Sequence, residues 1–167
     1  MSNTYTLENE LQWTGTLAEP DVQWFDSLKK NRPKANIITK CVWKKSGEIL
    51  KFIDAEGLST ISLYNNKDMY QNIRNGKKEF NVETITLHEM LVKHNAPKRI
   101  DYLSIDTEGS EFDILKAHDF SKYTFDVITC EHNYTSNRKK IYDLLTEKGY
   151  KRKYENLSLV DDWYVRG

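Results

Sequence analysis

Short apolar runs that end in an acidic residue and lead into a helical pattern occur three times along the chain. The runs are residues 16–19, 100–106 and 125–131, and the helices predicted after them span residues 21–31, 110–117 and 136–148. Strand-loop-helix units in series favour parallel strands joined by right-handed crossovers. The pattern therefore predicts the α/β class, with a Rossmann-like, mostly parallel open sheet covered by helices on both faces.

The acids that end these runs are the first candidates for a functional site. They are Glu19, Asp106 and Glu131. In open α/β sheets, ligands bind beyond the carboxyl ends of the strands. We therefore expect the three side chains to lie on one edge of the sheet.

The remaining segments have the spacing of antiparallel strands. Runs rich in β-branched residues lie at 36–43, 48–53, 58–63 and 80–86, and two more, at 150–154 and 157–165, predict a C-terminal antiparallel hairpin. Residues 65–76 have little apolar periodicity and predict a mobile helix or loop over the site. No repeat or linker divides the chain, so residues 1–167 are expected to form a single domain.

Composition narrows the class of protein further. Hydrophobic residues make up 38% of the chain and charged residues 30%, with a net charge of zero, which is typical of a soluble globular protein and does not favour a nucleic-acid partner. No apolar stretch approaches the roughly 20 residues that cross a bilayer, and no signal peptide is evident, so the expected location is cytoplasmic, without a membrane partner. Cys41 and Cys130 lie far apart in apolar runs and are expected to be buried free thiols, not a disulfide or a metal pair.

Residues 100–111, IDYLSIDTEGSE, resemble the signature of the FkbM-type S-adenosylmethionine-dependent methyltransferases. Supporting segments are 17–20 (LAEP) with 28–33 (LKKNRP), 130–133 (CEHN) and 161–165 (DDWYV), which together extend over nearly the whole chain. The resemblance implies the class I methyltransferase fold, S-adenosylmethionine as the cofactor, and methyl transfer to an oxygen of a small-molecule or carbohydrate-like acceptor.

The resemblance also implies residues that bind the cofactor. Glu19 is similar to the acid that accepts hydrogen bonds from the ribose hydroxyls, since a carboxylate offers two acceptors to a vicinal diol. Val42 and Trp43 stand where the family contacts adenine. Trp43 either stacks on the base or packs beneath the neighbouring hairpin as a core residue.

Four polar residues are candidates for the chemistry. Asp106 stands where methyl donor and acceptor would meet, so it is both a catalytic and a cofactor-binding candidate, and Glu108 is a candidate general base. Glu111 falls in a first helical turn, where an acid is favoured for structural reasons alone. His132 is a candidate base because a histidine titrates in the range useful for deprotonating an alcohol, and Glu131 and Asn133 are expected to set its tautomer. The alternative is that His132 has no catalytic role, as is more often true of a lone histidine in a loop. Asp106 and Glu108 alone are thin evidence for Mg²⁺, and no metal site is predicted.

The family's first strand and glycine-rich cofactor loop have no counterpart in the sequence. The seven glycines are far apart, and residues 2–11 resemble the helix that follows that loop, with Leu7 and Leu11 at its apolar spacing. Either the sequence is truncated, or the loop was lost while the scaffold was kept. The alternatives to an enzyme are a non-catalytic remnant or binding module and, less favoured, another Rossmann-like nucleotide binder.

In the family fold the missing strand lies between the strands that end in Glu19 and Asp106. Its absence exposes two backbone edges or forces those strands to pair. The sequence therefore predicts a homo-oligomer or a rearranged sheet, with weak or no cofactor binding.

Overall fold

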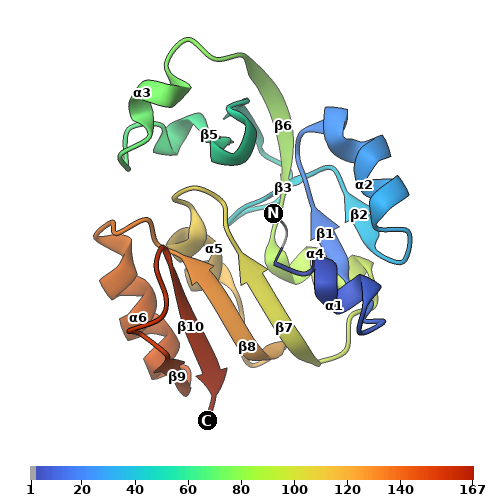
Figure 1. Ribbon diagram of the computed structural model, residues 1–167, viewed down its shortest axis with the longest axis vertical. Helices are drawn as coiled ribbons and strands as arrows, with labels where there is room; N and C mark the ends of the chain where they lie inside the picture. The colour runs from blue at the N-terminus through green and yellow to red at the C-terminus, as the bar shows by residue number, and fades with distance from the viewer. Residues whose placement is uncertain (1–2) are drawn as a thin grey trace.

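The computed structural model describes residues 3–167 and arranges their strands in three sheets. Two sheets have four strands each, in the orders β7-β8-β10-β9 and β3-β6-β4-β5, and the third is the pair β1-β2. In Figure 1 the C-terminal sheet lies below the segment that carries β5 and α3, with β1, β2 and α2 beside them. The prediction of one mostly parallel sheet is therefore wrong, although the mixture of helices and strands is as expected.

The C-terminal sheet contains the strands that the sequence pattern predicted best. Its strands are β7 (Arg99–Ile105), β8 (Thr124–Glu131), β9 (Tyr150–Lys153) and β10 (Asp161–Arg166). β7 and β8 are parallel, whereas β10 is antiparallel to both β8 and β9, which confirms the predicted C-terminal hairpin.

The helices that connect these strands are amphipathic and cover the sheet. α5 (Glu111–Ala117) and α6 (Asn137–Glu147) agree with the predicted helices to within one residue at each end. Ile114 and Leu115 of α5 and Ile141 and Leu145 of α6 are almost completely buried, in one cluster with strand residues such as Ile128. Burial of each such side chain contributes about 1.5–3 kcal/mol, so this packing holds the carboxyl ends of β7 and β8 in place.

The second sheet is built by the middle of the chain. Its elements are β3 (Cys41–Val42), β4 (Ile49–Ile53), β5 (Thr60–Ile61) and β6 (Glu79–Ile85), with the 3₁₀ helices η2 (Glu56–Leu58) and η3 (Ser62–Tyr64), α3 (Gln71–Arg74) and α4 (Leu87–Lys93) along the same segment. β4 is antiparallel to β5 and β6, as predicted, while β3 is parallel to β6. Cys41 of β3 and Cys130 of β8 are buried free thiols, which confirms that prediction.

The N-terminal part forms the small third sheet and its helices. These elements are α1 (Tyr5–Asn9), β1 (Thr16–Ala18), η1 (Val22–Trp24), α2 (Phe25–Asn31) and β2 (Asn36–Ile38). Leu11 is exposed, so the predicted apolar spacing of Leu7 and Leu11 does not mark a buried face. Instead, a buried ion pair of 2.5 Å between Arg32 Nε and Glu8 Oε2 fastens α1 to the end of α2. Residue 2 of the predicted first helix lies outside the described residues.

β1 and β7 belong to different sheets and do not pair with each other. Within residues 3–167, β1 pairs only with β2, and β7 pairs only with β8. Asn3 Nδ2 donates a hydrogen bond to Ser104 Oγ of β7 at 3.0 Å, so the described N-terminus lies beside this strand. Paired strands lie about 4.8 Å apart. Because β1 and β7 do not pair, the single sheet predicted from the sequence is interrupted between these two strands.

No helix within residues 3–167 has the length and apolar character needed to span a membrane.

Candidate functional site

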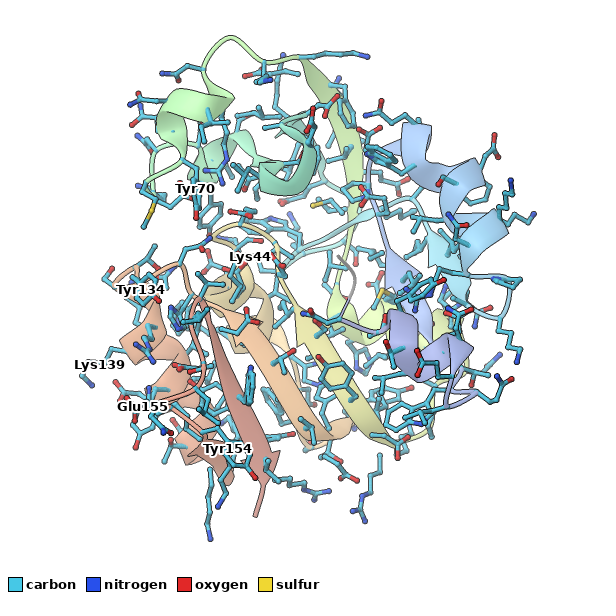
Figure 2. All side chains as sticks on the ribbon, in the orientation of Figure 1. Lys44, Tyr70, Tyr134, Lys139, Tyr154 and Glu155 are labelled. Carbon is cyan, nitrogen blue, oxygen red and sulfur yellow. The ribbon has the colours of Figure 1, made fainter. Side chains whose placement is uncertain are left out.

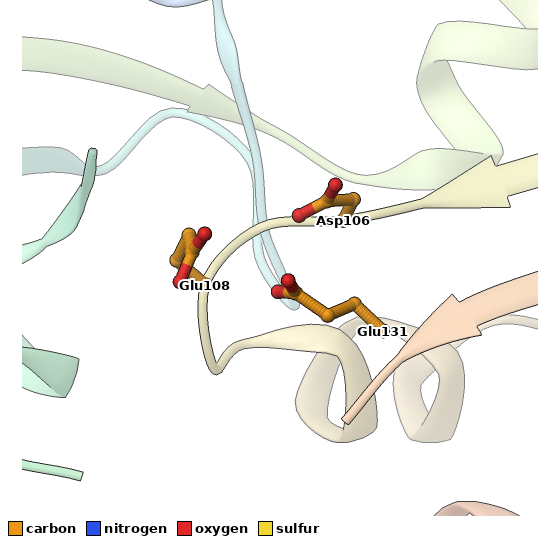
Figure 3. A group of neighbouring side chains, drawn as sticks. All are labelled: Asp106, Glu108 and Glu131. Carbon is orange, nitrogen blue, oxygen red and sulfur yellow. The ribbon is translucent and has the colours of Figure 1, made fainter. Parts of the chain in front are cut away.

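The carboxyl ends of β7 and β8 bring three carboxylates together. Asp106 directly follows β7, Glu108 lies in the next turn, and Glu131 is the last residue of β8. The parallel register pairs Ile105 with Cys130, which makes Asp106 and Glu131 neighbours at this edge. One oxygen from each of the three carboxylates lies within 4.8 Å of the others (Figure 3). Two of the three predicted strand-end acids are therefore brought together, with Glu108 as the third member of the cluster.

Glu108 is buried and held by an arginine from a distant segment. Arg74 Nη2 donates to Glu108 Oε2 at 2.9 Å, and Asn133 Nδ2 donates to the same oxygen at 3.1 Å. Burial and the neighbouring Asp106 raise the pKa of Glu108 to about 7, while the Arg74 charge opposes the rise. A carboxyl group with a pKa in this range can both accept and release a proton near neutral pH.

Arg74 was not identified by sequence reasoning, although the segment that carries it was expected over the site. It lies on α3, where its guanidinium also pairs with both oxygens of Asp68 at 2.8 and 2.9 Å and contacts the ring of Tyr70 at 5.9 Å. Figure 2 shows Tyr70 in the segment above the carboxyl ends of β7 and β8. The segment has no apolar periodicity that would have revealed a buried arginine, so the sequence carried no signal for this residue.

The surroundings of Glu131 raise its pKa further than those of Glu108 raise the pKa of that residue. Its side chain is buried, and its Oε2 has no hydrogen-bond partner in the described part of the chain. Burial, followed by the charges of Asp106 and Glu108, raises the pKa of Glu131 to about 10. At neutral pH this carboxyl therefore retains a proton unless another positive charge takes its place.

Glu111 holds the turn that carries Glu108. Its Oε1 accepts hydrogen bonds from the Thr107 amide at 2.7 Å, the Thr107 hydroxyl at 2.9 Å and the Gly109 amide at 3.1 Å. The side chain is buried, and burial raises its pKa against the opposing effect of these hydrogen bonds. These contacts support the structural interpretation of Glu111.

The ring of His132 contacts Tyr134 and faces β10. Its Nδ1 accepts the Tyr134 amide at 3.0 Å, and its Nε2 faces Asp162 Oδ1 of β10 at 3.7 Å. The backbone of Tyr134 thus sets the tautomer that was expected to depend on Glu131 and Asn133. Burial lowers the pKa of His132, which favours the neutral ring.

Glu19 lies in a separate groove and is not part of the carboxylate cluster. The groove runs between α2 and η2 and is also lined by Trp24, Asp54 and Lys77. Glu19 Oε1 accepts the Asp21 amide at 3.0 Å, and burial is the main cause of its raised pKa. The expectation that Glu19 shares one sheet edge with Asp106 and Glu131 is wrong, because β1 and β7 belong to different sheets.

Trp43 is a core residue in the structure, whereas Val42 is only half-buried. The Trp43 side chain is 2% exposed, its ring meets Tyr64 edge-on at 5.9 Å, and its Nε1 donates to Glu48 at 3.2 Å. Lys44, which is labelled in Figure 2, places its Nζ 4.8 Å from the Trp43 ring. The structure therefore corresponds to the packing alternative for Trp43 and leaves no exposed ring face for an adenine.

Comparison with known families supports the resemblance seen in the sequence. Residues 2–152 match the methyltransferase FkbM domain. Neither the curated proteins nor the solved structures provide a match. The family match extends over most of the chain and includes the strands and turns that bring Asp106, Glu108 and Glu131 together, and the chain therefore belongs to the methyltransferase FkbM domain family.

Proposed function

We propose that the protein transfers a methyl group from S-adenosylmethionine to a hydroxyl oxygen of a small-molecule or carbohydrate-like acceptor. The observation that carries the proposal is Glu108, a buried carboxyl with a pKa of about 7 at the carboxyl end of β7. Methylation of a hydroxyl requires removal of its proton, and a base is most effective when its pKa lies near the working pH. Membership of a methyltransferase family supports the reaction class.

Glu108 is positioned to take the hydroxyl proton on one oxygen. In the described part of the chain, the two donors Arg74 and Asn133 both engage Oε2, so Oε1 is the oxygen to which the proton would move. The two donors also prevent the carboxylate from rotating. Arg74 has a second role, because its positive charge keeps the pKa of Glu108 from rising further.

The residues present fit the nucleoside part of the cofactor. Glu19 borders an open groove, and its carboxylate suits the two ribose hydroxyls, while Trp24 in the same groove offers an apolar ring. When bound, S-adenosylmethionine supplies an electrophilic methyl group on a positively charged sulfur. Asp106 is exposed at the end of β7, where its negative charge would attract such a cation.

The proposal is tested by binding and by transfer. Calorimetric titration should show binding of S-adenosylmethionine and S-adenosylhomocysteine that is weak, because the glycine-rich loop has no counterpart in the sequence. The affinity should fall at least about tenfold further in Glu19→Gln, since loss of a charged hydrogen bond costs about 1.5–3 kcal/mol. Transfer is measured as tritium from the labelled methyl group in a panel of sugars and small alcohols.

Glu108→Gln is the matched variant for the transfer step. It should retain cofactor binding and lose methyl transfer. Binding without transfer to any hydroxylated acceptor would support the alternative of a non-catalytic binding module, and absence of binding would refute the proposed function.

A further inference from the structure

The three carboxylates at the ends of β7 and β8 have the arrangement of cation ligands. Asp106, Glu108 and Glu131 each contribute one oxygen, and these oxygens lie within 4.8 Å of one another. Figure 3 shows the three side chains around a common space beside the turn that follows β7. An ion equidistant from three oxygens that are 4.8 Å apart would lie about 2.8 Å from each, so each carboxylate would have to move by less than about 1 Å to reach the roughly 2.3–2.6 Å typical of Ca²⁺ or the roughly 2.0–2.1 Å typical of Mg²⁺.

A second observation points to a ligand at the same place. Glu131 is only 7% exposed, yet its Oε2 has no hydrogen-bond partner among residues 3–167. Buried carboxylate oxygens are normally paired, because an unpaired one loses its hydration without compensation. The orphaned oxygen belongs to the residue that faces Asp106 across the parallel strand ends.

The positive charge of Arg74 beside Glu108 is shared with Asp68. Arg74 contacts Glu108 at 2.9 Å, but the same guanidinium binds both oxygens of Asp68. Arg74 therefore compensates the Glu108 side of the cluster, and its guanidinium is not directed to Asp106 or Glu131. Asp106 is exposed, which gives an ion access from solvent and leaves coordination positions open to water or to oxygens of a substrate.

We propose that Asp106, Glu108 and Glu131 bind one divalent cation of the hard, oxygen-preferring class, such as Mg²⁺, Mn²⁺ or Ca²⁺. The ligand set contains only carboxylate oxygens, which suit these ions, whereas zinc and copper sites normally include histidine or cysteine. The alternative way to relieve the same repulsion is a proton shared between Glu131 and Asp106. An ion bound here would lower the pKa of Glu108 and offset the negative charge of Asp106, so the ion-bound chain is a state distinct from the metal-free chain in which Glu108 acts as the base. The binding test needs neither the cofactor nor an acceptor, so its outcome is distinguishable from that of the proposed function.

The test is cation binding by the purified chain after EDTA treatment and desalting. Mn²⁺ binding is followed by electron paramagnetic resonance, and Mg²⁺ and Ca²⁺ binding by calorimetry, without S-adenosylmethionine or an acceptor. We expect one ion per chain and at least tenfold weaker binding in Asp106→Asn and in Glu131→Gln.

Matched controls remove the same charge from the same strands at a distance from the site. The controls are Asp101→Asn and Asp126→Asn, because Asp101 lies near the start of β7 and Asp126 near the start of β8. Both variants should bind the cation with the affinity of the wild type. Asp106→Asn is the decisive variant if Glu131→Gln fails to fold by circular dichroism, because Asp106 is exposed.

Two results would overturn the proposal. One is the absence of saturable binding up to millimolar cation, which would favour the shared proton. The other is binding that survives Asp106→Asn with unchanged affinity, or that weakens equally in the two control variants, because either result would place the ions elsewhere on the acidic surface.

Discussion

Replacement of Arg74 by methionine is the most informative perturbation of the site's framework. Methionine retains an apolar stem of similar length but removes the guanidinium, which donates to the Leu58 carbonyl at 2.6 Å, to Asp68 at 2.8 and 2.9 Å and to Glu108 at 2.9 Å. The side chains of Arg74, Asp68 and Glu108 are 0%, 2% and 7% exposed, so water cannot replace the lost donors. Two buried carboxyl groups and one carbonyl would be left without this partner.

The expected loss of stability follows from these contacts. Hydrogen bonds to charged groups contribute about 1.5–3 kcal/mol each, but a carboxyl group that loses its partner can take up a proton and recover part of the cost. Loss of one partner of a buried ion pair typically costs about 3–5 kcal/mol, which we adopt for Arg74→Met. With a urea m-value of about 2 kcal/mol/M, the unfolding midpoint should fall by about 1.5–2.5 M.

The assay is urea unfolding followed by circular dichroism at neutral pH in EDTA. Arg99→Met is the control, because Arg99 makes a similar contact of 2.7 Å with Asp126 but is 72% exposed. Exposed pairs of this kind contribute little, so the control should have no resolvable effect on the midpoint. Equal midpoints for Arg74→Met and Arg99→Met would refute the view that Arg74 stabilises the acidic site.

Four further outcomes are expected. Asp106→Asn should reduce methyl transfer about 10²-fold with little change in the urea midpoint. Glu111→Gln should instead cost about 1–3 kcal/mol of stability, because it disturbs the Thr107–Gly109 turn. The reverse pattern would contradict these roles. Gly109→Ala should lower stability by about 1–3 kcal/mol, because the φ of Gly109 is +117° and an added Cβ would lie 3.0 Å from Tyr64. The loss should exceed that of the control Gly76→Ala, where an added Cβ would meet nothing within 4 Å. Burial lowers the pKa of His118 below 6.5, so the unfolded chain takes up that proton first and the contribution of His118 to stability should fall as pH drops below 6.5. A nuclear magnetic resonance titration midpoint of His118 at or above 6.5 would contradict this. Among residues 3–167, β1 and β7 each have one edge without a partner strand, which predicts self-association that light scattering would detect as a mass above that of the monomer.

The sequence pattern predicted the C-terminal half of the fold well. β7, α5, β8 and α6 agree with the predicted runs to within one residue at each end, and the terminal hairpin was also recognised. Their apolar periodicities are strong within short windows, and local periodicity is the main signal that a sequence carries about secondary structure. The adjacency of Asp106 and Glu131 follows from the same signal, because parallel strands end on the same edge.

The sheet as a whole was not predictable in this way. Within residues 3–167, β1 pairs only with β2, and the antiparallel strands β4, β5 and β6 form a separate sheet together with β3. Strand pairing depends on which backbone edges come within hydrogen-bonding distance, and local patterns contain no information about that distance. The same limit applies to Glu19, whose position after β1 was correct but whose sheet was not.

By itself, the sequence determined the family, the strand-turn-helix units and the identity of the acids at the strand ends, because each of these is encoded in a few consecutive residues. Only the tertiary structure decided what surrounds those acids. Arg74 reaches Glu108 from 34 positions away, the ring of His132 turns toward β10, and Trp43 enters the core. The pKa values and the proposed cation site depend on burial and on charges from distant segments, and these exist only after the chain has folded.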